Sequence, residues 1–581
     1  MRLLRPREEN VALPLTTDDR LGDDRLEQLL VAAGKVSAER LEDTRHSSIA
    51  PGDSLAGRLV AAGLISTEEL TATIAAYYGA ERIDLSRVAP APEALALLRR
   101  EQARALRAVP IAVDQQGVRV AVVDPSPEHV ALVQAAIGRP VHALVATHQG
   151  IVRALDAEYR VTDEVGRHVQ AFETRDELRR ESEQRSTGQV NEDAPVVQVV
   201  QKIITQGLHD RASDIHLEPA GERVRVRYRI DGALVDVLDL PGSIGPALVS
   251  RVKILAGMNI VERRRPQDGQ ISMTVDQREV DIRIASTAVV GGEKLVLRLL
   301  DKSRPLFRTK QLGMAPETEE KYVALLRQPY GMVVCAGPTG GGKTTTLYAS
   351  LGELDTPERN IMTIEDPVEY TFDSINQIQI NEQAGMTFAG GLKSILRQDP
   401  DVILVGEIRD VDTARIAVQS ALTGHLVLSS LHATEAVSAL YRLLDMGIEA
   451  FLIASSVSAV MAQRLVRRSC TSCLESYVPS AEELAFLRSI GGAQPIGGFR
   501  RGAGCHYCSG TGYLERIGVY ELLVITDAMR ELIVDHAPQD SLRKLARCEG
   551  MSTLQEQGAR LVAEGITTAA EVMRSIYVAG V

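Results

Sequence analysis

Uninterrupted apolar runs mark a set of predicted strands in the C-terminal half of the chain. They occur in GMVVC (331–335), in NIMTIEDPVEY (360–370), at 402–405, and between His425 and His432. Short runs of this kind are typical of strands buried on both faces of a parallel sheet. The residues after Thr344 predict a helix. We therefore expect an α/β domain here, with its ligand crevice at the carboxyl ends of the strands.

Strict alternation of apolar and polar positions marks a second region at 224–240. Apolar residues alternate with Arg225, Arg227 and Arg229, and Asp231-Gly232 supplies a tight turn, which predicts a β-hairpin with one apolar face. The stretches 278–286 and 293–301 predict further strands. Apolar residues at helical spacing precede them: Val196, Val199, Val200, Ile203 and Ile204. Together these patterns predict an α+β domain.

The N-terminal region contains a weak internal repeat. RLEQLLVAAGKVSAERL (25–41) and SLAGRLVAAGLISTEEL (54–70) share Leu-Val-Ala-Ala-Gly. Each copy predicts a short helix, a glycine stop and a second helix that begins at a serine. Strand-like and helical runs then alternate from about 81 to 160. Residues 165–194 are polar and densely charged, which predicts a linker that is helical in part.

These patterns predict a multidomain α/β protein. Residues 1–164 form a helical N-terminal domain with a small α/β module, 165–194 the linker, 195–305 the smaller α+β domain, and 306–581 the main α/β domain. The main domain carries a tetracysteine subdomain at 466–515 and C-terminal helices at 516–581. We expect the last helix to begin at a capping box, Thr568-Ala-Ala-Glu571.

Composition and charge narrow the function classes. The 581 residues are 45% apolar and 24% charged, with a net charge of −12, which disfavours a nucleic-acid motor because such motors carry a basic stripe. No apolar stretch approaches the ~20 residues that span a bilayer. The first twenty residues lack the apolar core of a signal peptide. We therefore expect a cytoplasmic protein that reaches a membrane through partners.

The stretch GPTGGGKTTT at 337–346 contains a complete phosphate-binding pattern, G-x-x-x-x-G-K-[ST]. Glycines let the backbone wrap closely around an anion, and the N-terminus of the following helix favours phosphate. Lys343 is expected to reach the β- and γ-phosphates, and Thr344 to offer its hydroxyl to Mg²⁺. The predicted nucleotide-binding residues are Gly337, Pro338, Thr339, Gly340, Gly341, Gly342, Lys343, Thr344 and Thr345.

Carboxylates and histidines follow the neighbouring predicted strands. Glu407 stands at the end of the 402–405 strand and is expected to hold the Mg²⁺ shell through water. Glu369 is the expected water-orienting residue, with Glu365 or Asp366 as the competing candidate. Two histidines flank another strand, and each either senses the γ-phosphate or satisfies core hydrogen bonds: His425 and His432.

Four of the six cysteines form two C-x-x-C hooks, Cys470-Thr-Ser-Cys473 and Cys505-His-Tyr-Cys508. In a reducing compartment, paired hooks indicate metal more than disulfides. Four thiolates can close a tetrahedral shell around Zn²⁺ and leave no open position for catalysis. The prediction is a structural zinc site.

Several long motifs in the same order resemble the secretion ATPases. These are GPTGGGKTTTLY, IEDPVEY, LRQDPDVILVGEIRD, TGHLVLSSLHA, AQRLVRR, ASDIHLEP and the two cysteine hooks. The chain is similar, more narrowly, to the type II secretion and type IV pilus extension ATPases, from about 195 to 575. The resemblance implies a RecA-like P-loop ATPase core, preceded by a helical docking domain and a smaller α+β domain.

The resemblance also implies roles for individual residues. Glu369 would be the catalytic glutamate of the aspartate box, and Glu407 the Walker B carboxylate. Arg283 and Arg298 match arginines that such enzymes bring to the γ-phosphate when two domains close. Arg397 and Arg409 match phosphate-facing or interface-facing arginines, and His425 and His432 lie in the histidine box.

The function that follows is a hexameric motor that hydrolyses ATP and drives an inner-membrane platform. Its partners would be that platform and membrane proteins with cytoplasmic domains. Two rivals are a nucleic-acid translocating motor and a ring adaptor that binds ATP without hydrolysis. Some relatives bind cyclic di-GMP through tandem Arg-Leu-Gly motifs. Here Arg25-Leu26-Glu27 and Ser54-Leu55-Ala56 lose the glycine, so we favour a plain docking domain.

Overall fold

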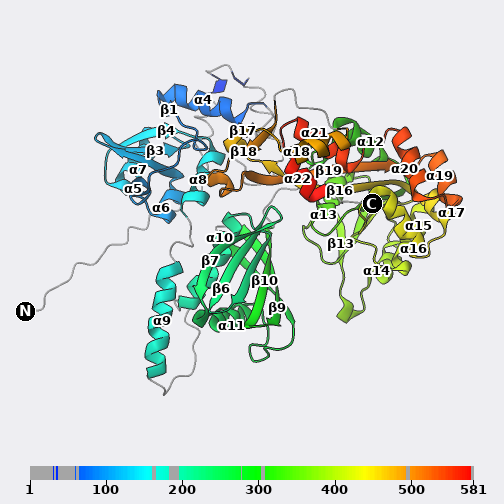
Figure 1. The fold of residues 1–581 in the computed structure, drawn as a ribbon, viewed down its shortest axis with the longest axis horizontal. Coiled ribbons are helices and arrows are strands. Elements are labelled where there is room, and N and C mark those ends of the chain that lie inside the picture. The colour runs from blue at the N-terminus through cyan, green and yellow to red at the C-terminus, as the bar shows by residue number, and fades with distance from the viewer. Residues whose placement is uncertain are drawn as a thin grey trace, which may run out of the picture. The chain divides into compact units, whose positions relative to one another are not determined.

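The structure is a computed structural model that describes residues 30, 31, 35, 36, 59, 64–159, 165–181, 195–275, 278–301, 308–491 and 498–576. Its contacts divide the chain into two compact units, 1–159 and 160–581, each of mixed α/β build (Figure 1). The two tripeptides at 25–27 and 54–56 lie outside the described residues. Among the described helices, none combines the length and apolar character that a bilayer crossing requires.

The first unit contains a small four-stranded sheet with the order β1-β4-β3-β2. Ser66 begins the helix before it, as predicted: its hydroxyl accepts from the Glu69 N–H, and the Glu69 carboxylate accepts from the Ser66 N–H. The elements are α4 (Thr67–Tyr78), β1 (Glu81–Arg82), α5 (Pro92–Leu95), α6 (Arg100–Ala105), β2 (Ala108–Asp114), β3 (Gly117–Val122), α7 (Pro127–Ile137), β4 (Val141–Val145) and α8 (His148–Glu158).

The second unit begins with an antiparallel sheet of six strands in the order β7-β6-β5-β10-β9-β8. The predicted hairpin forms, with Asp231 and Gly232 both at positive φ in its turn. Its elements are α9 (Val165–Glu181), α10 (Pro195–His209), β5 (Asp214–Ala220), β6 (Arg223–Ile230), β7 (Ala233–Pro241), α11 (Gly245–Leu255), β8 (Gln267–Val275), β9 (Arg278–Val289) and β10 (Gly292–Asp301).

The two faces of this sheet differ in polarity. Apolar residues such as Ile215, Val226 and Leu297 form a buried core with residues of α10 and α11. The alternate positions carry charges on the other face. The core also contains Val165 and Val169 of α9, so the polar stretch after residue 164 supplies a helix that packs on this domain.

A seven-stranded sheet follows, with the order β13-β12-β14-β15-β11-β16-β19; only the β16–β19 pair is antiparallel. Its elements, with a two-stranded β17–β18 sheet, are α12 (Pro316–Leu326), β11 (Gly331–Ala336), α13 (Lys343–Leu354), β12 (Ile361–Glu365), β13 (Asn376–Gln379), α14 (Phe388–Ile395), β14 (Val402–Val405), α15 (Val411–Leu422), β15 (Leu426–Leu431), α16 (Ala436–Asp445), α17 (Ala450–Ser456), β16 (Val457–Ser469), β17 (Leu474–Ser476), α18 (Ala481–Ser489), β18 (Arg500–Gly502), β19 (Tyr513–Val524), α19 (Asp527–Val534), α20 (Gln539–Cys548), α21 (Leu554–Ala563) and α22 (Ala569–Ile576).

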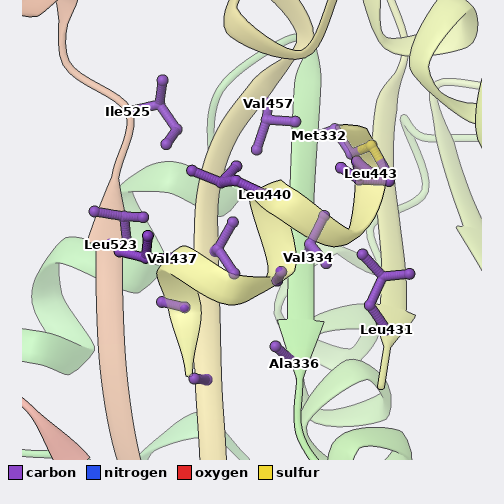
Figure 2. Packing of buried hydrophobic residues seen from close by; sticks show 14 of the residues in the cluster. Met332, Val334, Ala336, Leu431, Val437, Leu440, Leu443, Val457, Leu523 and Ile525 are labelled. Carbon is purple, nitrogen blue, oxygen red and sulfur yellow. The ribbon is translucent and has the colours of Figure 1, made fainter. Parts of the chain in front are cut away.

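The central strands are buried on both faces, which explains their unbroken apolar runs. Met332 and Val334 of β11 belong to the same core as Leu440 of α16, and Figure 2 shows this helix lying across the strands. Val333 and Cys335 point to the opposite core, which contains α13. Each such side chain contributes about 1.5–3 kcal/mol when it is removed from water.

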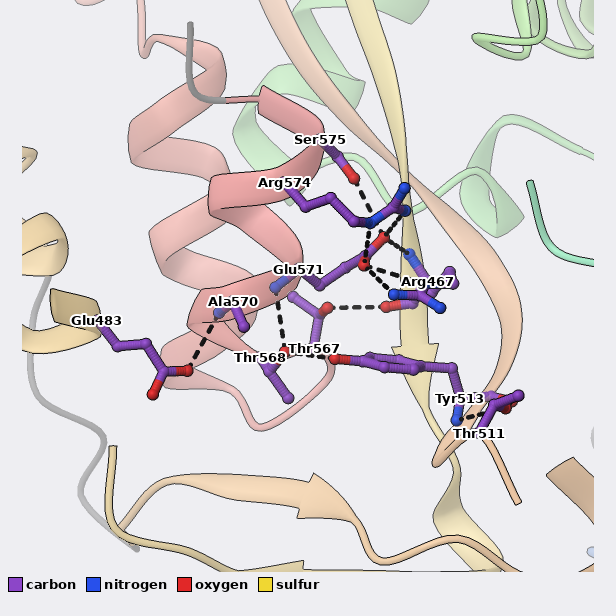
Figure 3. Close-up of polar contacts among 10 residues, drawn as sticks. All are labelled: Arg467, Glu483, Thr511, Tyr513, Thr567, Thr568, Ala570, Glu571, Arg574 and Ser575. Atoms are coloured by element: carbon purple, nitrogen blue, oxygen red, sulfur yellow. Dashed lines mark hydrogen bonds and ion pairs between the residues drawn. The ribbon is translucent and has the colours of Figure 1, made fainter. Parts of the chain in front are cut away.

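The C-terminal helix α22 is fastened to β16 by a buried carboxylate, Glu571 (Figure 3). The Thr568 hydroxyl accepts from the Glu571 N–H, which is one half of the predicted capping box. The Glu571 carboxylate accepts from the backbone and guanidinium of Arg467 and from Arg574 instead. Burial opposes ionisation, but the hydrogen bonds from Arg574 and Arg467 outweigh it and hold the pKa of Glu571 at about 2.

We expect Glu571→Gln to lower the stability of this region by about 1–3 kcal/mol at pH 7, because both arginines lose their buried charge partner. The folded-state pKa of Glu571 lies below its unfolded value, so the stabilisation is present above about pH 4.5 and is lost as the pH falls toward 2. The gap in thermal denaturation midpoint between the two proteins should therefore narrow from pH 5 to pH 3. Glu564→Gln, at an exposed ion pair with Arg560, is the control and should change little.

Candidate functional site

The phosphate-binding pattern forms the loop between β11 and α13. Gly340 and Gly342 adopt positive φ angles of 72° and 87°, which favour glycine. Gly337 is required for a different reason: a Cβ there would lie 2.7 Å from the backbone oxygen of Gln463. Gly341 has an ordinary φ, and its Cβ would come within 3.0 Å of the Pro338 oxygen. Gly337 therefore lets the loop lie against β16, and Gly341 lets the loop fold closely on itself.

Lys343 is the first residue of α13 and turns back over the loop. Its Nζ donates to the carbonyl oxygens of Gly337 and Pro338 at 2.9 and 3.0 Å. An ammonium has three donors, so one N–H remains for a ligand. Burial lowers the pKa of Lys343, and the charge of Glu407 opposes that shift. The lysine is therefore a desolvated cation held by its own loop, with a carboxylate nearby.

The carboxylate is Glu407, two residues beyond the end of β14. It pairs with Arg409, and its other oxygen lies 3.6 Å from Nε2 of His432, which directly follows β15. Gly406 lies against β12, where a Cβ would come within 3.3 Å of the Ile364 oxygen. A larger residue at 406 would crowd that strand. Glu407, His432, Arg409 and Lys343 thus form one group at the carboxyl edge of the sheet.

The three carboxylates after β12 have different environments. Glu365 is buried and accepts hydrogen bonds from Tyr348, Thr363 and Gln377, so its oxygens are occupied inside the domain. Asp366 is exposed. Burial raises the pKa of Glu369, the charge of Arg283 opposes this rise, Glu365 adds to it, and Arg298 opposes it. Glu369 is therefore close enough to Arg283 and Arg298 of the smaller domain to interact electrostatically with both.

Two predicted site residues are not brought into this group. His425 precedes β15 at the opposite edge of the sheet, and its Nδ1 lies 2.9 Å from the Ser420 oxygen. Arg397 is exposed just after α14, where it donates to the Lys393 oxygen. Within this chain neither side chain belongs to the group around the loop. For His425, the alternative of satisfying local hydrogen bonds agrees with the geometry.

Gln463 of β16 and Tyr348 of α13 belong to the site region and were not predicted. The Gln463 Nε2 donates to the Gly341 oxygen at 2.7 Å, and the side chain is buried. The Tyr348 hydroxyl donates to Glu365 and accepts from the Glu369 N–H at 3.2 Å. The only sequence signal for Gln463 is its place in AQRLVRR, because its contact lies more than one hundred residues away.

The four hook cysteines converge in a separate cluster. Their sulfur atoms lie within 4.8 Å of one another, and three of the separations are 3.8, 3.9 and 3.8 Å. A tetrahedral site with Zn–S bonds of about 2.3 Å requires sulfur separations of about 3.8 Å. The backbone N–H groups of Gly504 and Gly512 donate to the sulfurs of Cys473 and Cys508, which favours their thiolate form. The cluster fits Zn²⁺, and its four protein ligands would close the shell.

Comparisons with known proteins place these features in a wider group. A family model described as "Type II/IV secretion system protein" matches residues 189–574, and an "MshEN domain" model matches residues 78–165. The chain is 49% identical to the type II secretion system protein HxcR of Pseudomonas aeruginosa over 381 residues, covering 66% of this chain and 77% of that protein. It is 37% identical to the type IV pilus assembly ATPase PilB of Myxococcus xanthus over 561 residues, covering 94% and 98%. A crystal structure of the pilus retraction motor PilT with bound ADP shares 25% identity at a TM-score of 0.44, covering 64% of this chain and 95% of that one.

We expect the purified chain to contain one equivalent of zinc, because the sulfur positions match a tetrahedral shell. Elemental analysis would measure it. Cys505→Ser should reduce the zinc content to well under half an equivalent and destabilise the 470–512 region, whereas Cys548→Ser, at an exposed cysteine outside the cluster, should retain full zinc. A zinc-free wild-type protein of normal stability would contradict the assignment.

Proposed function

Because the chain belongs to the type II/IV secretion system protein family, we propose that it is an ATPase motor that powers type II protein secretion or type IV pilus assembly. The family membership agrees with the resemblance read from the sequence motifs. The observation that carries the proposal is the convergence of Lys343, Glu407 and His432 at one edge of a parallel sheet, directly beside the phosphate-binding loop.

In this proposal the loop holds the triphosphate of ATP. The backbone N–H groups of the first turn of α13, which have no partner within the helix, would face the phosphates, and the remaining donor of Lys343 would bond to them. Thr344 and Glu407 would hold Mg²⁺, which neutralises phosphate charge when bound. Arg409 pairs with one oxygen of the Glu407 carboxylate, and Nε2 of His432 lies 3.6 Å from the other, so both would favour one orientation of that carboxylate.

Glu369 is the group proposed to orient the attacking water. Its competitors are less suited: Glu365 is engaged by three internal hydrogen-bond donors, and Asp366 is exposed. Burial raises the pKa of Glu369, which makes its carboxylate a better proton acceptor. Arg283 and Arg298 are near enough to influence that pKa, and they would offset charge that develops on the γ-phosphate.

We propose the following division of the chain into domains. Residues 306–581 form the RecA-like core, 195–305 the smaller domain that contributes the arginines, and 1–164 a docking domain. The cysteine subdomain at 466–515 is a structural zinc site, and 516–581 supply the C-terminal helices. Six copies would form a ring on the cytoplasmic side of the inner membrane, recruited by a platform protein and other membrane partners. ATP binding and hydrolysis would move the smaller domain and the RecA-like core relative to each other.

We expect Glu369→Gln to reduce kcat for ATP hydrolysis by about 10²-fold or more, with a small change in KM, because the amide cannot accept a proton from water. The matched control is Asp366→Asn, which makes the same kind of change at an exposed carboxylate three residues earlier in the chain. This variant should retain more than half of the activity. A steady-state phosphate-release assay on the assembled protein measures both. Equal losses in the two variants would remove the special role of Glu369.

Lys343→Ala should weaken ATP binding by about tenfold or more, because a charge-assisted hydrogen bond to phosphate is lost. Equilibrium titration with a fluorescent ATP analogue measures the Kd directly. Lys544→Ala, at an exposed lysine of α20, should bind like the wild type. Unchanged affinity in Lys343→Ala would show that the loop is not the nucleotide site.

Stimulation of hydrolysis by DNA alone would favour a nucleic-acid motor instead.

A further inference from the structure

A row of charged side chains crosses the polar face of the six-stranded sheet. Cross-strand partners share a face, and the register aligns Arg229 of β6 with Asp214 of β5, Asp214 with Arg298 of β10, and Arg298 with Arg283 of β9. Gln270 of β8 is the next partner of Arg283. Four of these side chains are charged, and three of the four charges are positive.

The two arginines proposed to face the γ-phosphate are therefore direct cross-strand neighbours. Like charges placed opposite each other destabilise a sheet unless something compensates them. Within the described part of the chain, Arg283 has no carboxylate at ion-pair distance, and Arg298 has Asp214. The row keeps an excess of positive charge that an anionic group can neutralise. A surface hollow lies over it, and its charged lining residues are Arg283, Arg298 and Asp268.

Asp214 accepts a hydrogen bond from the Nε nitrogen of Arg298. The Asp214 Oδ1 lies 3.0 Å from that nitrogen, so both terminal nitrogens of the Arg298 guanidinium remain available to a ligand. The Asp214 side chain is only 8% exposed, whereas that of Arg298 is 58% exposed. The Ser213 hydroxyl holds the other carboxylate oxygen at 2.8 Å, and Arg229 lies 3.7 Å from it. A buried carboxylate that is itself hydrogen-bonded thus holds the Nε nitrogen of an exposed arginine.

We propose that Asp214 is a positioning residue for hydrolysis, which aims Arg298 at the γ-phosphate by holding its Nε. The inference rests on the proposed ATPase function. The carboxylate does not touch the nucleotide. It removes the rotational freedom of a long side chain before ATP arrives, so that less entropy is lost when the guanidinium meets the transition state.

The same strand offers a matched control. Glu218 follows Asp214 by four residues in β5 and therefore lies on the same face of the sheet. Its side chain is 12% exposed. It accepts from Arg227 and Lys294 and has no contact with Arg298. Burial opposes its ionisation, but the Arg227 and Lys294 hydrogen bonds hold the pKa of Glu218 at about 2. Glu218→Gln therefore perturbs a buried ion pair of the same sheet without disturbing the proposed contact.

The test compares Asp214→Ala, Asp214→Asn, Arg298→Ala, the double variant Asp214→Ala/Arg298→Ala and Glu218→Gln in the full-length protein. Steady-state ATP hydrolysis gives kcat and KM, and thermal denaturation gives the stability of each variant. We expect Asp214→Ala to lower kcat about tenfold or more with KM within a factor of three. Asp214→Asn should recover part of the activity, because its amide oxygen can still accept from Nε.

The double variant separates positioning from general stability. If Asp214 acts through Arg298, the double variant should be no slower than Arg298→Ala alone, and Glu218→Gln should keep its kcat even where its denaturation midpoint falls. Additive losses in the double variant, or an equal kcat loss in Glu218→Gln, would overturn the inference. Normal activity of Asp214→Ala beside an impaired Arg298→Ala would also overturn it. Normal activity of Arg298→Ala would instead refute the arginine role in the proposed function.

Discussion

The hydrogen-bond register of the parallel strands is the constraint on which the candidate site depends. Ala336 of β11 pairs with Leu431 of β15, and Val405 of β14 pairs with Ser429, so these three strands end at nearly the same level. The phosphate-binding loop, Glu407 and His432 follow those ends and must therefore meet. Because these strands are buried on both faces, a shift in register by one residue would exchange side chains between the two cores and disrupt the packing of both. The core that excludes water thus also fixes the site.

Charged groups of both signs occur on the two parts of the proposed active site. The seven-stranded sheet supplies Lys343 and the Glu407–Arg409 pair, and Glu369 follows β12. On the six-stranded sheet, Arg283 and Arg298 are cross-strand neighbours, and Asp214 pairs with Arg298. The electrostatic interaction of Glu369 with both arginines gives a physical reason for the two domains to close, and the phosphates of a nucleotide would add negative charge beside the same arginines.

Features set by short sequence segments could be predicted. The loop at 337–344, the hairpin turn at Asp231-Gly232, the serine start of α4 and the cysteine hooks each depend on a few adjacent residues with restricted conformations. The apolar runs gave the strands of the main domain for the same reason. The family resemblance, carried by long motifs in fixed order, was confirmed by the match over residues 189–574.

Features set by contacts between distant segments could not be predicted. Gln463 supports the loop from a strand far along the chain, and Asp214 meets Arg298 only because β5 and β10 are neighbours. Likewise, Glu571 fits a capping-box pattern, yet its carboxylate binds Arg467, a stronger partner that the local sequence does not reveal. His425 and His432 lie in one sequence motif, but the whole of β15 separates them, so they reach opposite edges of the sheet. The motif alone does not indicate which edge each histidine reaches.

Strand β16 connects three parts of the domain. Gln463 donates a hydrogen bond to the phosphate-binding loop, Arg467 binds Glu571 of α22, and the strand ends at Ser469, directly before the first hook cysteine, Cys470. An extended strand rises about 3.3 Å per residue, so Gln463 and the first cysteine are about 23 Å apart. The pairing with β19 is regular from Gln463 to Arg467 and changes register between Arg467 and Ser469. Deleting one residue between Gln463 and Arg467 would turn Arg467 away from Glu571, and deleting two would draw the cysteines about 7 Å toward the loop. The length of the strand between Gln463 and Arg467 is therefore a constraint of its own, separate from the identity of the residues between them.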